Sequence, residues 1–245
     1  MTEARRVALV TGASGAIGRA CAIALADAGH RVVVGYSGNE EAGKVTAKAC
    51  PDSILVRLDV TDPASVEAAF AAAEEAVGPV DVLVNNAGIT ADGLVMRMSD
   101  EQWSSVLRTN LDGAFHCIRR ATPKMMRGRF GRIVNIGSVA GSIGGPGQAN
   151  YSAAKAGLIG LTRATARELA TRGITCNVVA PGPVSSAMTD ALPEARRDEL
   201  AAQVPVGRFG TADEVAATVA FLASDLAGYI TGAVVPVDGG LGMGH

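Results

Sequence analysis

Short apolar runs rich in β-branched residues alternate along the whole chain with stretches of helical spacing. Apolar strands separated by helices are typical of a parallel sheet that helices cover on both faces. The sequence therefore predicts an α/β fold with a doubly wound sheet of seven parallel strands. Its ligand crevice is expected at the carboxyl ends of the strands. The predicted strands are Val7–Val10, Arg31–Val34, Ile54–Leu58, Val80–Val84, Arg132–Ile136, Thr175–Val179 and Val234–Val237. The predicted helices are Ile17–Ala28, Pro63–Val77, Trp103–Arg127, Tyr151–Thr171 and Ala212–Ala223.

Length and composition narrow the class of protein. A chain of 245 residues with no linker or repeat suits one α/β domain over residues 1–245. The net charge of −2 argues against a nucleic-acid surface. The four scattered cysteines form no CxxC pair, which favours buried free thiols over a disulfide or a metal site. The apolar run Val7–Val10 is too short for a signal peptide or a membrane span, so we expect a cytoplasmic protein.

A glycine-rich turn joins the first predicted strand to the first predicted helix. It reads Thr11-Gly-Ala-Ser-Gly-Ala-Ile-Gly18, with the spacing Gly-x3-Ala-x-Gly. Glycines permit the tight turn, and backbone N–H groups at a helix N-terminus can bind a pyrophosphate. An ordinary strand-to-helix turn is the alternative. The candidate dinucleotide contacts in this turn are Gly12, Ser14, Gly15, Ile17 and Gly18.

The ends of the second and third predicted strands should reach the adenosine half of a dinucleotide. A carboxylate after the second strand would bind the ribose 2′-hydroxyl and repel a 2′-phosphate. Here Tyr36 and Ser37 occupy that place, and the first carboxylate is Glu40. This pattern neither excludes NADP nor recruits it with a cation, and a plain polar turn is the alternative. Asp59, beside Val60, can accept a bond from the adenine amino group.

The run Asn85-Asn86-Ala87-Gly88 follows the fourth predicted strand. Its small residues leave room for the adenine ribose, and we place Asn86, Ala87 and Gly88 among the cofactor contacts. The two asparagines can equally tie the turn together, and both functions are compatible.

The spacing Ser138-x12-Tyr151-x3-Lys155 predicts a proton-transfer site. Tyr151 and Lys155 share one face of a helix, and a nearby ammonium lowers the pKa of a phenol. Ser138, at the carboxyl end of the fifth strand, can hydrogen-bond a substrate oxygen as charge develops on it. Asn110 is a polar residue inside a predicted helix and can hold a water that links Lys155 to solvent.

The spacing Tyr-x3-Lys also arises by chance, as a surface tyrosine and lysine. Its coincidence with Ser138, Asn110 and the glycine-rich turn argues against that alternative. The histidines offer no competing site, because His30, His116 and His245 have no partner pattern. We interpret all three as structural.

Taken together, these motifs resemble those of the short-chain dehydrogenase/reductase family over the whole chain. The resemblance implies a Rossmann fold and a catalytic tetrad of Asn110, Ser138, Tyr151 and Lys155. It also implies that Lys155 binds the nicotinamide ribose hydroxyls. The motif Pro181-Gly182 belongs to the same pattern. Further cofactor contacts are then expected at Pro181, Gly182, Val184 and Ser186.

Within that family, the chain most resembles the reductases of 3-oxoacyl-[acyl-carrier-protein] in fatty acid synthesis. The similar stretches are Gly131–Gly141, Gln148–Tyr151, Gly207–Thr211 and Tyr229–Gly232, and the ending Val237–His245 is similar to actinobacterial members. This resemblance implies NADPH, a homotetramer and an acidic acyl carrier protein as partner. Arg129 and Arg172 match the basic residues that receive the carrier beside the site. Solvated arginines are the alternative.

The chain departs from these reductases at two positions. Gly15 stands where an arginine usually helps to hold the 2′-phosphate, and Ser186 stands where a threonine is common. The hydroxyl of Ser186 keeps a carboxamide contact available. The stretch from Ser185 to Arg208 is predicted to form a lid over the crevice.

The predicted function is reduction of a 3-oxoacyl-[acyl-carrier-protein] by NADPH, with NADH as the second choice of cofactor. Another substrate, such as acetoacetyl-CoA, a polyketide or a small secondary alcohol, is compatible with the same tetrad. A non-catalytic nucleotide-sensing or scaffold subunit is the alternative of another class. That class would tolerate loss of Tyr151 or Lys155, and both are present.

Overall fold

The protein is described here by a computed structural model that covers residues 5–185 and 194–243. Within these residues the chain forms one sheet of seven parallel strands, in the order β3-β2-β1-β4-β5-β6-β7. The doubly wound parallel sheet predicted from the sequence is therefore confirmed. The strands are β1 (Val7–Val10), β2 (Arg31–Tyr36), β3 (Ile54–Arg57), β4 (Val80–Asn85), β5 (Gly131–Ile136), β6 (Ile174–Pro181) and β7 (Val234–Val237).

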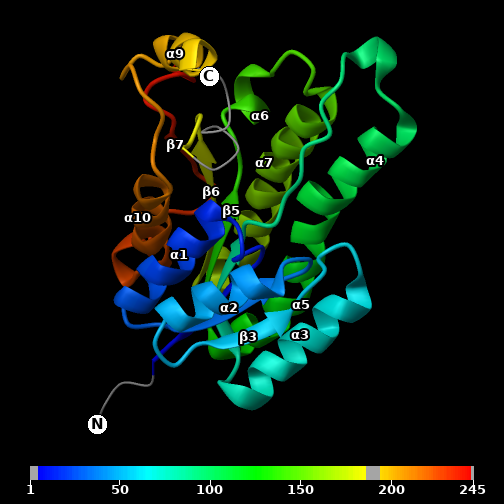
Figure 1. Ribbon diagram of the computed structural model, residues 1–245. Helices are drawn as coiled ribbons and strands as arrows, with labels where there is room; N and C mark the ends of the chain where they lie inside the picture. Colours follow the sequence, from blue (N-terminus) through cyan, green and yellow to red (C-terminus); the bar gives the residue numbers. More distant parts are fainter. Residues whose placement is uncertain (1–4, 186–193, 244–245) are drawn as a thin grey trace.

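Helices cover both faces of this sheet (Figure 1). One face carries α1 (Ala16–Asp27), α2 (Glu40–Ala49) and α10 (Ala212–Ala223). The other face carries α3 (Pro63–Ala76), α5 (Gly113–Gly128) and α7 (Ala149–Leu169). The short helix α6 (Ala140–Ile143) and α9 (Glu194–Ala202) lie near the carboxyl ends of the strands, at the top of Figure 1.

Alternate residues of the strands belong to two separate hydrophobic clusters. Val10 and Val34 pack with α1 and α10, whereas Leu9, Val33 and Ile133 pack with α3 and α5. Side chains of a strand point alternately to the two faces, so strands buried on both sides read as continuous apolar runs. The four cysteines are buried and free. Burial raises the pKa of the Cys117 thiol to about 12.

The long predicted helix Trp103–Arg127 is three elements in the structure. They are α4 (Asp100–Leu107), a π-helical segment η2 (Arg108–Asp112) and α5. A capping box between Ser99 and Gln102 begins α4 three residues before the predicted start. The Gly113 N–H donates to the Arg108 carbonyl five residues back, which is the π-helical pattern. The π-helical segment does not interrupt the spacing of the apolar residues, so that spacing does not reveal it.

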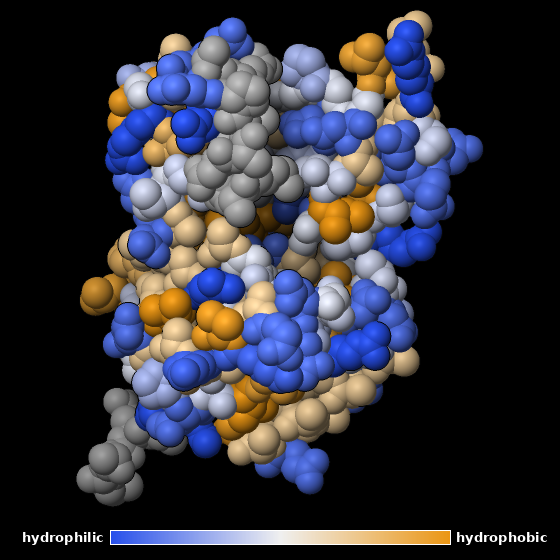
Figure 2. Space-filling view, in the orientation of Figure 1, coloured by the Kyte–Doolittle hydropathy of each residue, from blue (hydrophilic) through white to orange (hydrophobic). Residues whose placement is uncertain are grey.

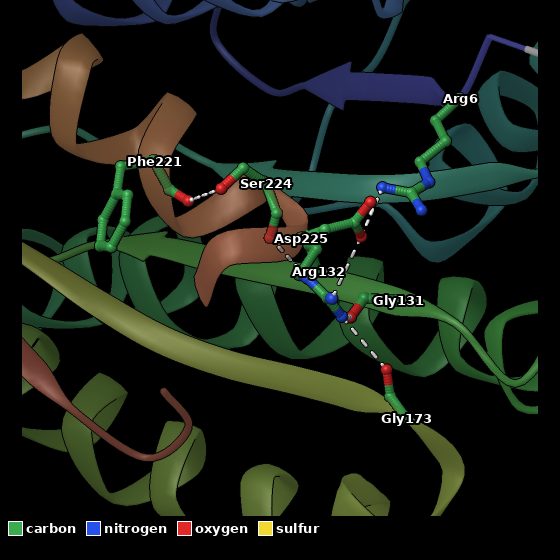
Figure 3. A network of polar contacts seen from close by, with 7 residues as sticks. All are labelled: Arg6, Gly131, Arg132, Gly173, Phe221, Ser224 and Asp225. Carbon is green, nitrogen blue, oxygen red and sulfur yellow. Dashed lines mark hydrogen bonds and ion pairs between the residues drawn. The ribbon is translucent and has the colours of Figure 1, made fainter. Parts of the chain in front are cut away.

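The edge of the sheet where the strands begin is held by a buried arginine, Arg132 of β5. Its guanidinium donates to the carbonyls of Gly131, Gly173 and Ser224, at 3.0, 3.2 and 3.2 Å. It also lies 3.7 Å from the Asp225 carboxylate, which Arg6 contacts at 2.8 Å. Figure 3 shows these groups converging from β5, from the turn before β6 and from the end of α10.

The predicted lid, Ser185 to Arg208, lies only partly within the described residues. Helix α9 and the loop after it belong to this stretch, and Val184 bridges to Gly210 at its base. Residues 186–193, with Ser186, lie outside the described residues. In the described part of the chain, no helix is long and apolar enough to cross a membrane.

Candidate active site

Two adjoining cavities form a crevice at the carboxyl ends of the strands. Their volumes are about 700 and 610 Å³, and Ile17, Asn86, Gly88, Ile89 and Val184 line both. Figure 2 shows the surface hollowed across the middle of this face. The crevice lies where a doubly wound sheet places its ligand.

The larger cavity collects most of the predicted dinucleotide contacts. Its predicted lining residues are Gly12, Ser14, Gly15, Ile17, Gly18, Ser37, Asp59, Val60, Asn86, Ala87, Gly88 and Val184. Tyr36 is not among them, because its side chain packs against Gly43 of α2. Pro181, Gly182, Tyr151 and Lys155 line the smaller cavity.

The glycine-rich turn is tied to the turn after β4. The Thr11 hydroxyl accepts from the backbone N–H groups of Asn86 and Ala87, both at 2.9 Å. The Asn86 amide donates back to the carbonyls of Thr11 and Gly12, at 2.9 and 3.1 Å. Gly12 has a φ of +62°, and a Cβ there would lie 2.9 Å from the Ala87 Cα. Asn86 therefore ties the turn together as well as lining the cavity.

Asp59 presents an ionised carboxylate to the larger cavity. Its Oδ1 accepts from the N–H and the hydroxyl of Thr61, at 2.9 and 2.7 Å, and these bonds lower the pKa of Asp59. The predicted helix cap of the neighbouring Asp62 is also present, because its carboxylate accepts from the Ala64 N–H at 2.9 Å.

The smaller cavity brings together all four residues of the predicted tetrad. Asn110, Ser138, Tyr151 and Lys155 come from η2, from the end of β5 and from α7, and all of them line it. The hydroxyl-bearing side chains of Tyr151 and Ser138 line the same cavity, and Ser138 acts to lower the pKa of Tyr151. A hydroxyl pair at the mouth of such a cavity can bind a carbonyl oxygen and supply its proton.

Lys155 is buried and binds the backbone of β5. Its Nζ donates to the Ile136 carbonyl at 2.8 Å and lies 5.5 Å from the centroid of the Tyr151 ring. Burial lowers the pKa of Lys155 to about 8.

The pKa of Tyr151 departs from the sequence-based expectation. We expected the ammonium of Lys155 to lower it, but burial raises the pKa of Tyr151, and Ser138 offsets only part of that rise. The reason is the position of the Lys155 Nζ, which is bonded to Ile136 rather than to the phenol.

The π-helical segment η2 turns Asn110 toward Lys155. The Asn110 Nδ2 donates to the carbonyls of Ile89 and Val106, both at 2.9 Å. Its Oδ1 is buried and has no hydrogen-bond partner among the described residues. That oxygen and the Lys155 Nζ both flank Gly88, within 4 Å of where a Cβ would lie. An unpaired buried carbonyl oxygen beside a lysine suits a bound water.

Two further asparagines support the site, and the sequence analysis did not identify them. Asn150 begins α7, and its amide donates to the carbonyls of Ala91 and Gln102, both at 3.0 Å. Asn135 of β5 accepts from Asn85 and donates to Thr162 of α7, both at 2.8 Å. A polar residue inside an apolar strand was the available signal, because a buried amide needs partners.

Comparisons with known proteins agree with this arrangement. A family model described as enoyl-(acyl carrier protein) reductase matches residues 12–242. The 3-oxoacyl-[acyl-carrier-protein] reductase FabG of Staphylococcus aureus (strain N315) is 50% identical over 240 residues, which are 96% of this chain and 98% of that one. FabG of Escherichia coli (strain K12) is 50% identical over 238 residues, 97% of this chain and 98% of that one. The chain belongs to the short-chain dehydrogenase/reductase family.

A solved structure shares the fold over nearly the whole chain. It is a crystal structure of an Agrobacterium tumefaciens protein provisionally assigned as a gluconate dehydrogenase. Its TM-score is 0.93 at 35% identity, covering 97% of this chain and 96% of that one. Short-chain dehydrogenases/reductases of different described activities thus share this architecture, so the substrate must be argued from the site and from the relatives.

Two predicted partner contacts of this short-chain dehydrogenase/reductase do not lie beside the crevice of their own chain. Arg129 follows α5 and precedes β5, and Arg172 precedes β6. Both are exposed. In a parallel sheet, the residues before the strands lie at the opposite edge from Ser138. These arginines therefore lie away from the crevice of their own chain, and their contact with a partner stays a prediction.

Proposed function

We propose that this chain reduces 3-oxoacyl-[acyl-carrier-protein] to 3-hydroxyacyl-[acyl-carrier-protein] with NADPH in fatty acid biosynthesis. The observation that carries the proposal is the convergence of Ser138, Tyr151 and Lys155 in one cavity that adjoins a larger, dinucleotide-sized cavity. The 50% identity to 3-oxoacyl-[acyl-carrier-protein] reductases over nearly the whole chain supports the substrate.

The residues of the crevice fit a nicotinamide dinucleotide. The backbone N–H groups at the start of α1 would hold the pyrophosphate, because Gly15 leaves this helix end without a side-chain cap. Asp59 would accept from the adenine amino group, and Lys155 would bind the nicotinamide ribose. Pro181 and Gly182 would line the nicotinamide pocket, with Ser186 as a further contact. The bound cofactor supplies the hydride.

The chain's own residues handle the proton. Ser138 holds the 3-carbonyl oxygen of the substrate through its hydroxyl, and Tyr151 donates its phenolic proton to that oxygen. Lys155, with its Nζ 5.5 Å from the centroid of the Tyr151 ring, supplies a positive charge near the phenolate that remains. Asn110 holds a water through its unpartnered Oδ1, and this water returns a proton toward Lys155.

The partner and the assembly belong to the same proposal. We propose an acidic acyl carrier protein as the partner and a homotetramer as the working form, in the cytoplasm. Because Arg129 and Arg172 lie at the far edge of their own sheet, they would serve the crevice of another copy in that tetramer. We further propose that residues 1–245 form a single domain. We also propose that the chain is a reductase of the actinobacterial type.

A comparison of substrates tests this function. Initial rates of NADPH oxidation are measured with acetoacetyl-[acyl-carrier-protein], acetoacetyl-CoA and simple ketones. The proposal predicts the highest kcat/KM with the carrier-bound thioester. A higher kcat/KM with the CoA ester or a free ketone would instead assign the enzyme to another carbonyl substrate. No turnover of any substrate would favour a non-catalytic function.

A further inference from the structure

We infer that this chain discriminates only weakly between NADPH and NADH, because the described residues that line the larger cavity offer no cation to the cofactor's 2′-phosphate. The inference rests on the proposed function and deepens it by assigning cofactor selectivity to residue 15. In Rossmann folds the 2′ position of the adenosine ribose lies at the end of β2, where an arginine accommodates a 2′-phosphate. Ser37, which directly follows β2, and Gly15 both line the larger cavity.

The charge that lines the larger cavity is negative. Among the described residues around it, Asp59 is the only charged side chain, and its pKa is lowered by the bonds from Thr61. Residues 186–193, which follow the loop at Val184, contain no lysine or arginine. A 2′-phosphate with close to two negative charges would therefore meet neutral dipoles rather than a cation among these lining residues.

The first turn of α2, just beyond Ser37, adds carboxylates. Glu40 and Glu41 both contact the single ammonium of Lys44, at 3.1 and 2.8 Å. After burial, Glu40 is the largest cause that raises the pKa of the Tyr36 hydroxyl. Arg57 of β3 is the register partner of Tyr36 and does not line the larger cavity as the structure describes it. Glu40, Glu41, Lys44 and Arg57 together carry no net charge, so the side chains at this end of α2 add no net attraction for a phosphate.

Arg19 is the cation closest in sequence to the glycine-rich turn, and it faces another way. Its Nε donates to the Thr46 hydroxyl of α2 at 3.2 Å, and Thr46 in turn donates to the Ala13 carbonyl at 2.9 Å. Arg19 does not line the larger cavity as the structure describes it. Its guanidinium therefore braces α1 against α2 behind the turn.

Gly15 has the room and the backbone conformation for a cationic side chain. Its φ is −85°, and the nearest atom to a Cβ placed there is the Gly12 carbonyl oxygen at 3.5 Å, an ordinary van der Waals contact. An arginine would thus enter without strain, at a residue that lines the cavity together with Ser37. A charge-assisted hydrogen bond to phosphate is worth about 10- to 150-fold in affinity.

Cofactor binding without acyl substrate tests the inference. Fluorescence titrations give the Kd of NADPH and NADH for the wild type, for Gly15→Arg and for Gly128→Arg. Gly128 is a matched control, because a Cβ there meets nothing within 4 Å and it ends α5 at the opposite edge of the sheet. Competition by adenosine 2′,5′-bisphosphate and by 5′-AMP measures the contribution of the 2′-phosphate to binding, because the two competitors differ in that group.

The expected wild-type preference for NADPH over NADH is less than tenfold. Gly15→Arg should raise the preference for NADPH at least tenfold. It should also increase the affinity for adenosine 2′,5′-bisphosphate and leave the affinity for 5′-AMP unchanged. Gly128→Arg should change neither the preference nor these affinities. A wild-type preference of tenfold or more, or an unchanged preference in Gly15→Arg, would overturn the inference and leave the proposed reductase function standing. Failure of the wild type to bind either cofactor would overturn both.

Discussion

At the scale of single residues, the most costly group in the site is Lys155. It is buried at the carboxyl end of the sheet, where its ammonium donates to the Ile136 carbonyl. Burial lowers its pKa from the ordinary 10.5 to about 8. A charge held in this way destabilises the folded chain, so its retention points to a use in the crevice rather than in folding.

The amount by which the buried Lys155 ammonium lowers the free energy of unfolding depends on pH. Between pH 8 and 10.5 the unfolded chain keeps a proton that the folded chain releases, so this lysine makes stability rise with pH across that window. Below pH 8 the penalty is complete, on the order of 3 kcal/mol. Lys155→Met should therefore gain stability relative to the wild type at pH 7, and this advantage should shrink by about that amount by pH 10.5.

Urea unfolding at both pH values measures this difference. Lys48→Met, at an exposed position of α2, is the control and should show a difference that stays constant with pH. A Lys155→Met advantage that is equally constant would show that burial does not penalise this ammonium.

At the scale of the elements, Arg132 joins three backbone segments at the edge opposite the crevice. Its side chain is only 7% exposed, and its three carbonyl partners lie in β5, in the turn before β6 and after α10. Burial lowers the pKa of this guanidinium, and Asp225 offsets part of that effect. The contacts of this residue are therefore expected to matter for stability and not for the chemistry at Ser138.

Replacing Arg132 separates stability from turnover. Arg132→Met leaves three carbonyls without their donor and should lower the free energy of unfolding by about 2–4 kcal/mol, with kcat unchanged for the folded protein. Arg208→Met removes an exposed ion pair with Glu214 and should leave the free energy of unfolding nearly unchanged, because solvent screens such a pair. Thermal unfolding and kcat are compared for both variants. A large loss of kcat in folded Arg132→Met would mean that the two edges of the sheet are coupled.

The elements also show which features the sequence could predict. Strands β1 and β7 and helix α10 have the predicted bounds, because apolar runs and the Thr211 cap mark their ends. Helix α2 was missed, since its ten residues are mostly polar and include Gly43. The π-helical turn at Asn110 was missed because one extra residue per turn hardly changes apolar spacing.

At the scale of the whole molecule, the order of the strands brings motifs that lie far apart in the sequence together around one crevice. The parallel sheet brings the ends of β1, β4, β5 and β6 to one edge, and with them Gly12, Asn86, Ser138 and Gly182. The tetrad could be predicted because its spacing is local. The separation of Arg129 and Arg172 from their own crevice follows from the same strand pattern, because both residues precede predicted parallel strands.

The central claim is that Tyr151 donates the proton in a crevice that binds the cofactor independently of that step. Tyr151→Phe removes one hydroxyl from a ring that is otherwise retained. The decisive measurement is kcat for reduction of acetoacetyl-[acyl-carrier-protein] by this variant, taken together with the Kd of NADPH from titration. We expect kcat to fall at least a hundredfold, the contribution of a positioned proton donor (about 10²–10⁴-fold), while the Kd stays within about threefold of the wild type. Near-wild-type turnover in Tyr151→Phe would contradict it.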